Sequence, residues 1–213
     1  MLHTAEVRWF FTGELPVAAR DWFCQDARPP EAQPARVDHY LPLADAALGV
    51  KVREGRVEIK QRQSAPRRER YHAEAVGYAA RWAKWSFGMT ADANSLVSLA
   101  TARATWIAVR KRRWSRQYRI ADYGTLSAVP ADKVVAWGCD VELTAVEIAG
   151  IACWTLGFEA AGPDATLDKT LRRVAGHVFA QTPPPFPLML EAAHSYPAWL
   201  QWLMTQHQGQ VVR

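Results

Sequence analysis

The sequence LGVKVREGRVEIKQR, residues 48–62, predicts two short strands joined by a turn at Glu54–Gly55. Successive strand residues point to opposite faces of a sheet, so one face of this hairpin is apolar and the other is mostly basic. In an open sheet the basic face would lie in water, whereas a barrel could turn it inward and form a site for a polyanion. The charged face carries Lys51, Arg53, Glu58, Lys60 and Arg62.

The composition is that of a globular protein with a basic surface. The chain has 213 residues, which suits one domain or a domain with a helical annex, and its net charge of +5 favours anionic partners. Its three cysteines show no C-x-x-C spacing, so we expect no disulfide framework and no cysteine zinc site. With no visible signal peptide and no long apolar run, we expect a cytoplasmic protein without a membrane partner.

Strand patterns dominate up to about residue 160, and helical patterns follow. We predict strands at residues 5–11, 37–43, 105–119, 133–144 and 151–159. We predict helices at residues 15–25, 164–181 and, for the most part, 188–207, with Pro197 beginning the second part of the last one. Residues 63–70 are polar and expected to be exposed, and residues 71–87 fit either a strand or a helix. This order predicts an α+β fold built around an antiparallel sheet or barrel.

Basic and acidic residues recur together on separate predicted strands. Residues 105–119 carry six Lys or Arg residues, and phosphate chains need several such donors that converge from different strands. Carboxylates beside them would suit a hard divalent cation. Alternating charge on a strand more often marks only the solvent-exposed face of a sheet. Here the alternation recurs on separate strands and mixes acidic with basic residues, which favours a charged face that points inward. The acids in predicted strands are Glu6, Glu58, Asp140, Glu142 and Glu159.

The hairpin resembles the K/R-x-R…E-x-K hairpin of the triphosphate tunnel metalloenzymes, also called CYTH-domain proteins. Upstream, residues 38–41 (DHYL) resemble the family's D-x-Y-[FL] segment, and downstream, residues 109–113 resemble its central basic strand. Residues 140–142 and 158–159 resemble its late acidic strands. These short motifs follow the family's order over roughly residues 5–160.

The resemblance implies a closed antiparallel barrel of about eight strands with a charged tunnel, made by residues 1–162. Residues 163–213 would add helices that pack on the barrel in the same domain. Members of the family hydrolyse triphosphates or cyclise ATP with Mg²⁺ or Mn²⁺. The implied phosphate-binding residues are Lys51, Arg53, Lys60, Lys111 and Arg113, and we add Arg62, which shares the charged face of the hairpin. The implied metal ligands are Glu6, Glu58, Glu142 and Glu159.

The first strand departs from the family's E-x-E-x-K pattern. The chain has Glu6-Val7-Arg8-Trp9-Phe10, so Arg8 replaces the second carboxylate and Phe10 replaces the lysine. An arginine at a metal-ligand position repels a cation and can itself bind phosphate, which puts Arg8 among the predicted phosphate-binding residues.

Three functions remain open from the sequence. The first is binding of a triphosphate or another polyphosphate-bearing anion, with or without metal-dependent hydrolysis. The second is non-catalytic binding of a phosphorylated metabolite. The third is nucleic-acid binding through residues 110–119, where Trp114 and Tyr118 could stack on bases, but the interleaved acids disfavour it. We therefore expect a small anionic partner, and a homodimer stays open.

Overall fold

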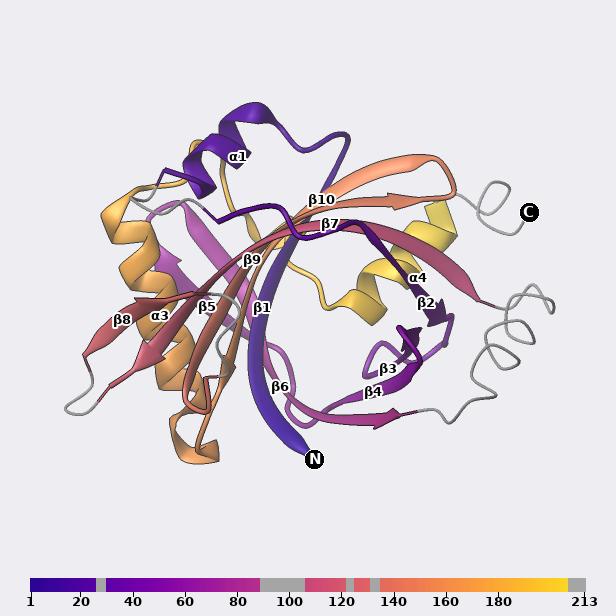
Figure 1. Cartoon of the computed structure of the whole chain (residues 1–213), viewed down its shortest axis with the longest axis horizontal. Coiled ribbons are helices and arrows are strands. Elements are labelled where there is room, and N and C mark those ends of the chain that lie inside the picture. The colour runs from indigo at the N-terminus through magenta and orange to yellow at the C-terminus, as the bar shows by residue number, and fades with distance from the viewer. Residues whose placement is uncertain (26–29, 89–105, 122–124, 131–134, 207–213) are drawn as a thin grey trace.

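Eight antiparallel strands close into a barrel in the computed structural model, which describes residues 1–25, 30–88, 106–121, 125–130 and 135–206 (Figure 1). Because the last strand of the series pairs with the first, the sheet is closed, and the predicted α+β barrel fold is confirmed. In order around the barrel, the strands are β1 (Leu2–Thr12), β10 (Ile151–Ala161), β9 (Gly138–Ile148), β7 (Ile107–Ile120), β2 (Arg36–Leu41), β3 (Leu48–Arg53), β4 (Arg56–Arg62) and β6 (Ala75–Gly88).

The strand register keeps one set of side chains inside the barrel. Glu6 on β1 lies opposite Glu159 on β10, which lies opposite Asp140 on β9. On its other side, Glu6 lies opposite Ala80 on β6, so the same parity is preserved where the barrel closes. Residues directly opposite each other point to the same face, and alternate residues of every barrel strand therefore face the interior.

The hairpin of β3 and β4 turns its charged face inward. Glu54 and Gly55 both have positive φ, 47° and 71°, as a two-residue hairpin turn between twisted strands requires. Glu58 is only 5% exposed, whereas Ile59 on the opposite face is only partly buried. The charged face is thus at least as well shielded as the apolar one, which an open sheet with a wet charged side would not give.

Two helices from the C-terminal part of the chain cover different parts of the barrel (Figure 1). Helix α3 (Leu167–Gln181) packs Leu171 and Phe179 against the outer face of β1, where Trp9 is fully buried. Helix α4 (Tyr196–Gln206) instead packs Trp199 against Phe10, which has the inward parity of β1. The barrel interior is therefore charged at its centre and apolar where α4 covers it.

One short helix and two short strands add to the barrel. Helix α1 (Val17–Phe23) begins after Pro16, close to the prediction for residues 15–25. Strand β5 (Arg67–His72) extends the sheet beside β6, and β8 (Leu126–Val129) extends it beside β7. Among the described helices, none is long and apolar enough to cross a bilayer.

Several predicted boundaries need correction. Residues 67–70 belong to a strand, the open segment 71–87 is mostly β6, and β9 begins later than predicted and runs on to Ile148. Residues 105, 133, 134 and 207 of the predicted elements lie outside the described part of the chain. Only a short 3₁₀ turn, η3 (Leu190–Ala192), precedes α4, so the first half of the helix predicted at residues 188–207 is wrong.

The segment before α4 is extended because it pairs with the barrel where β1 and β6 separate. Leu188 exchanges backbone hydrogen bonds with Glu74 and Val76 at the start of β6. The backbone N–H of His194 donates to the carbonyl oxygen of Arg8 on β1, at 3.0 Å. These backbone bonds bridge the two strands, and no helix could supply them in the same place.

Candidate anion-binding cavity

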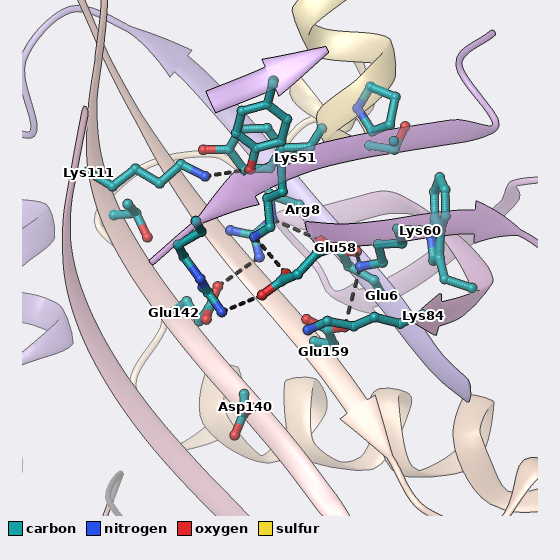
Figure 2. Close-up of a pocket in the computed structure, with 18 of the residues that line it drawn as sticks. Glu6, Arg8, Lys51, Glu58, Lys60, Lys84, Lys111, Asp140, Glu142 and Glu159 are labelled. Atoms are coloured by element: carbon teal, nitrogen blue, oxygen red, sulfur yellow. Dashed lines mark hydrogen bonds and ion pairs between the residues drawn. The ribbon is translucent and has the colours of Figure 1, made fainter. Parts of the chain in front are cut away.

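The interior of the barrel holds a cavity of about 210 Å³ whose walls are charged (Figure 2). Opposing strands contribute both signs of charge, with basic side chains in excess. The basic side chains are Arg8, Lys51, Arg53, Lys60, Lys84, Lys111 and Arg113, and the acidic ones are Glu6, Glu58, Asp140, Glu142 and Glu159.

Arg8 is held at the centre of this network. Its Nε donates to Glu6 at 3.0 Å, its Nη2 donates to Glu142 at 2.9 Å, and its Nη1 donates to Thr155 at 3.1 Å. Burial lowers the pKa of Arg8, but the charges of Glu6 and Glu142 outweigh this effect and raise it above its ordinary value. The guanidinium is therefore a permanent, fixed cation that bridges two carboxylates.

Lys60 forms ion pairs with Glu6 on β1 and Glu159 on β10. Its Nζ contacts Glu6 and lies 3.3 Å from Oε1 of Glu159, and it also lies 5.4 Å from the ring centroid of Trp82. Burial disfavours the ammonium form, yet the charges of Glu159 and Glu6 raise the pKa of Lys60. Lys60 thus remains protonated inside the barrel.

A second buried network centres on Asp38, whose side chain is fully buried. Lys111 Nζ lies 2.9 Å from Oδ2 of Asp38 and 2.6 Å from the hydroxyl of Tyr40, and Lys51 Nζ lies 3.6 Å from the same carboxylate oxygen. Burial alone would raise the pKa of Asp38, but the two ammonium groups hold it well below its usual range. Burial also lowers the pKa of both lysines.

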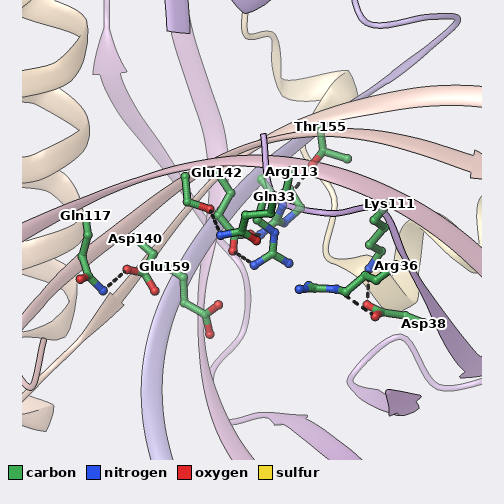
Figure 3. Close-up of polar contacts among 12 residues, drawn as sticks. Gln33, Arg36, Asp38, Lys111, Arg113, Gln117, Asp140, Glu142, Thr155 and Glu159 are labelled. Carbon is green, nitrogen blue, oxygen red and sulfur yellow. Dashed lines mark hydrogen bonds and ion pairs between the residues drawn. The ribbon is translucent and has the colours of Figure 1, made fainter. Parts of the chain in front are cut away.

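Asp140 differs from the other carboxylates of the cavity. Burial raises its pKa to about 6, and the negative charges of Glu142 and Glu159 act in the same direction. The amide of Gln117 donates a 2.6 Å hydrogen bond to Asp140, which opposes the shift only in part (Figure 3). By contrast, Glu142 lies 2.5 Å from Arg113 and has a lowered pKa, because Arg113 and Arg8 outweigh its burial.

The structure brings together all but one of the predicted site residues. Arg62 is the exception: it lines a neighbouring pocket between β6 and residues 190–198. The sequence did not single out Lys84, since it lies in a segment that fitted strand or helix equally well. Two further residues contact the charged network without belonging to a motif: Arg36 pairs with Asp38, and the ring of Tyr196 lies 4.0 Å from Nζ of Lys111.

The four predicted metal ligands do not fit a divalent cation in this arrangement. Glu6, Glu58, Glu142 and Glu159 each lie within 4 Å of a Lys or Arg nitrogen, and the guanidinium of Arg8 lies between Glu6 and Glu142. In the part of the chain that the structure describes, no three His, Cys, Asp or Glu residues are grouped as metal ligands. A metal there would have to displace cations already bonded to the carboxylates.

No protein-family model and no curated protein matches the sequence. Among solved structures, a conserved hypothetical protein from Pyrococcus furiosus is 13% identical with a TM-score of 0.41, over 90% of this chain and 98% of that one. The PH1819 protein from Pyrococcus horikoshii is 12% identical with a TM-score of 0.46, over 93% and 99%. The S. pombe Pct1 RNA triphosphatase, solved with the Spt5 CTD, is 10% identical with a TM-score of 0.39, over 99% and 85%.

At these identities and TM-scores, the three structures assign no role to any residue of this chain. The closed barrel and the positions of the sequence motifs are observed in this structure itself, without reference to the other three. Lys51, Glu58 and Lys60 of the hairpin, Lys111 of the basic strand and Glu142 of the late acidic strand all line one cavity. The residues that carry the sequence resemblance therefore lie together on the inner face of a closed eight-stranded barrel.

Proposed function

We propose that this chain binds a small polyphosphate-bearing anion, such as tripolyphosphate or a nucleoside triphosphate, inside the barrel. The observation that carries the proposal is the convergence of seven Lys and Arg side chains on one cavity that contains five carboxylates. Phosphate oxygens accept charge-assisted hydrogen bonds from such donors, and the low dielectric of a barrel interior strengthens them.

The carboxylates give these cations a fixed position before any ligand arrives. Glu58, for example, accepts from Arg53 at 2.5 Å and lies 3.0 Å from Lys51. A phosphate chain would share or replace such carboxylate contacts, so less conformational entropy would be lost on binding than with mobile side chains. Lys84 adds positive charge close to Glu58 and Glu159, whose pKa values it helps to lower.

Arg8 supports binding that needs no divalent ion. Its guanidinium already supplies a buried positive charge between Glu6 and Glu142, where the family resemblance placed a metal. A built-in cation balances part of the ligand charge at any metal concentration. In the proposed function, Mg²⁺ or Mn²⁺ therefore adds little to affinity beyond its own binding to the free ligand.

Hydrolysis is the second candidate, and Asp140 is the observation that favours it. A carboxylate with a pKa of about 6 accepts a proton near neutral pH far better than one with an ordinary pKa. Asp140 would take a proton from a water molecule that attacks the terminal phosphorus, and the remaining phosphate chain would leave with the electrons of the broken P–O bond. The basic side chains would stabilise the charge on the leaving oxygen.

Calorimetric titration with tripolyphosphate and with ATP tests the first proposal, in chelator and then with Mg²⁺ or Mn²⁺. We expect binding in chelator that Lys60→Ala weakens at least tenfold, while Arg68→Ala, which removes an exposed charge on β5, leaves it unchanged. If neither anion binds under either condition, the proposal fails. Phosphate release that Asp140→Asn abolishes would establish hydrolysis, with Glu142→Ala as a test of the network around Arg8.

A further inference from the structure

A second pocket, of about 570 Å³, lies between β6 and residues 190–198 and adjoins the charged cavity. We call it the aromatic pocket, because the rings of Tyr78, Trp82 and His194 line it. Four residues line both spaces, so the two meet at a common border made by Glu6, Arg8, Trp82 and Ser195. A ligand in the charged cavity that is long enough to cross this border would enter the aromatic pocket.

Strands β4 and β6 carry the lining from one space into the other. On the inner face of β6, Lys84 lines the charged cavity, Trp82 lines both spaces and Tyr78 lines only the aromatic pocket. On β4, Lys60 is opposite Lys84, and Arg62, the next inward residue, is opposite Trp82. Nζ of Lys60 lies 5.4 Å from the centroid of the Trp82 ring. A phosphate chain that contacts Lys60 would therefore place its next group beside Trp82.

The chemistry of the aromatic pocket differs from that of the charged cavity. Apart from the shared border, its charged lining consists, among the described residues, of Arg62 and Glu191, whose charges balance each other. Tyr78 and Trp82 offer aromatic rings, and Ala80, between them on the same face of β6, is small enough to leave space above the strand. Aromatic rings with a few polar groups suit a flat, uncharged ring system, whereas a further phosphate would find no excess of positive charge there.

His194 is a fixed and neutral part of this lining. Its Nε2 lies 2.9 Å from the backbone carbonyl oxygen of Glu191, which can only accept, so Nε2 carries the proton and Nδ1 is the acceptor of the ring. Burial lowers the pKa of His194, and the carbonyl oxygen opposes this effect only in part, so the ring is uncharged at neutral pH. The backbone N–H of His194 donates to the carbonyl oxygen of Arg8, which holds the ring beside the border.

We propose that the aromatic pocket takes the base of a nucleoside triphosphate whose phosphate chain occupies the charged cavity. This inference rests on the proposed function and narrows its ligand from any polyphosphate to a nucleotide. The base would stack on Tyr78 or Trp82, and an N–H group of the base would donate to Nδ1 of His194. Inorganic tripolyphosphate has no ring and would leave the aromatic pocket unused.

The test is calorimetric titration of the full chain, in chelator, with ATP, with methyl triphosphate and with adenosine. Methyl triphosphate keeps the triphosphate ester but lacks the nucleoside, and we expect ATP to bind about tenfold more tightly or better. Tyr78→Ala should remove most of this preference and leave the affinity for methyl triphosphate unchanged. Phe87→Ala is the matched control: Phe87 is 52% exposed and Tyr78 43%, both on β6, but the parity of Phe87 places it on the outer face. Thermal melts establish that each variant is folded.

The outcomes separate the aromatic pocket from the proposed function. If ATP and methyl triphosphate bind equally well, or if Tyr78→Ala weakens both alike, the role of the pocket is overturned and the function stands. Adenosine binding that depends on Tyr78, without binding of either triphosphate, would support the pocket and overturn the function. If the wild type binds none of the three, both fail. If Tyr78→Ala is not folded, Ala198→Leu, which fills the pocket from α4, replaces it, and an unchanged preference for ATP in that variant would overturn the proposal.

Discussion

Arg8 reaches Glu142 across the strand that separates them. Arg8 on β1 lies opposite Gly157 on β10, which in turn lies opposite Glu142 on β9, and the Nη2–Oε2 distance across this row is 2.9 Å. A Cβ atom on residue 157 would lie 2.5 Å from Cζ of Arg8. The missing side chain of Gly157 is thus the space that the guanidinium occupies.

Replacing Gly157 with alanine should therefore displace Arg8 from its carboxylates. We expect Gly157→Ala to lower the free energy of unfolding by about 1–3 kcal/mol, since a buried charged group loses its hydrogen bonds. Urea denaturation measures the change. In an Arg8→Ala background the same glycine substitution should cost clearly less, because the clash is gone. Equal costs in the two backgrounds would show that Gly157 does not serve Arg8.

Arg8 also predicts how the cavity responds to divalent ions. Arg8→Glu would put three carboxylates together without their cation, and we expect a loss of about 3–5 kcal/mol of stability, as when one partner of a buried pair is removed. Mn²⁺ or Mg²⁺ at millimolar concentration should then raise the melting temperature of this variant by about 5 °C. The wild type and the neutral Arg8→Gln variant should not respond. An equal metal response in the wild type would contradict the role given to Arg8.

Asp140 makes stability depend on pH in a predictable direction. Its pKa is about 6 in the folded protein and near 3.8 ordinarily, so the folded state binds the proton more tightly. The stability from this group is present below about pH 4 and is lost as pH rises to 6. Relative to the wild type, Asp140→Asn should gain up to about 3 kcal/mol of stability over that interval. Urea denaturation at pH 4 and pH 7 gives this difference, and a constant difference would contradict the raised pKa.

The hairpin shows how far the sequence could predict the fold. Alternation along residues 48–62 fixed which side chains share a face, and the turn at Glu54–Gly55 needed only local backbone preferences. Whether the charged face points inward is not a local property, because it depends on closure between β1 and β6. The family resemblance and the recurrence of mixed charge on several strands supplied that step, and the closed barrel confirms the fold.

Each difference between the predicted and the observed residues of the cavity has a physical cause. Arg36 carries no motif of its own, and Lys111, which lies opposite it on β7, is 75 positions away in the chain. Lys84 stands in a segment where small and aromatic residues hide the alternation of β6. Arg62 shares the parity of Lys60, yet the strand carries it beyond the charged cavity into the pocket beside residues 190–198. Parity predicts the face of a residue but not its height along the barrel.

The apolar end of the barrel gives the last prediction. Trp199 on α4 is 2% exposed and stacks on Phe10 at 4.3 Å between ring centroids, whereas Trp202 on the same helix is 41% exposed. Trp199→Ala should lower the free energy of unfolding by about 3–5 kcal/mol, the usual cost of removing a buried tryptophan. Trp202→Ala, as the matched control, should cost less than about 1 kcal/mol. Urea denaturation with intrinsic fluorescence measures both, and similar costs would mean that α4 does not close this end of the barrel through Trp199.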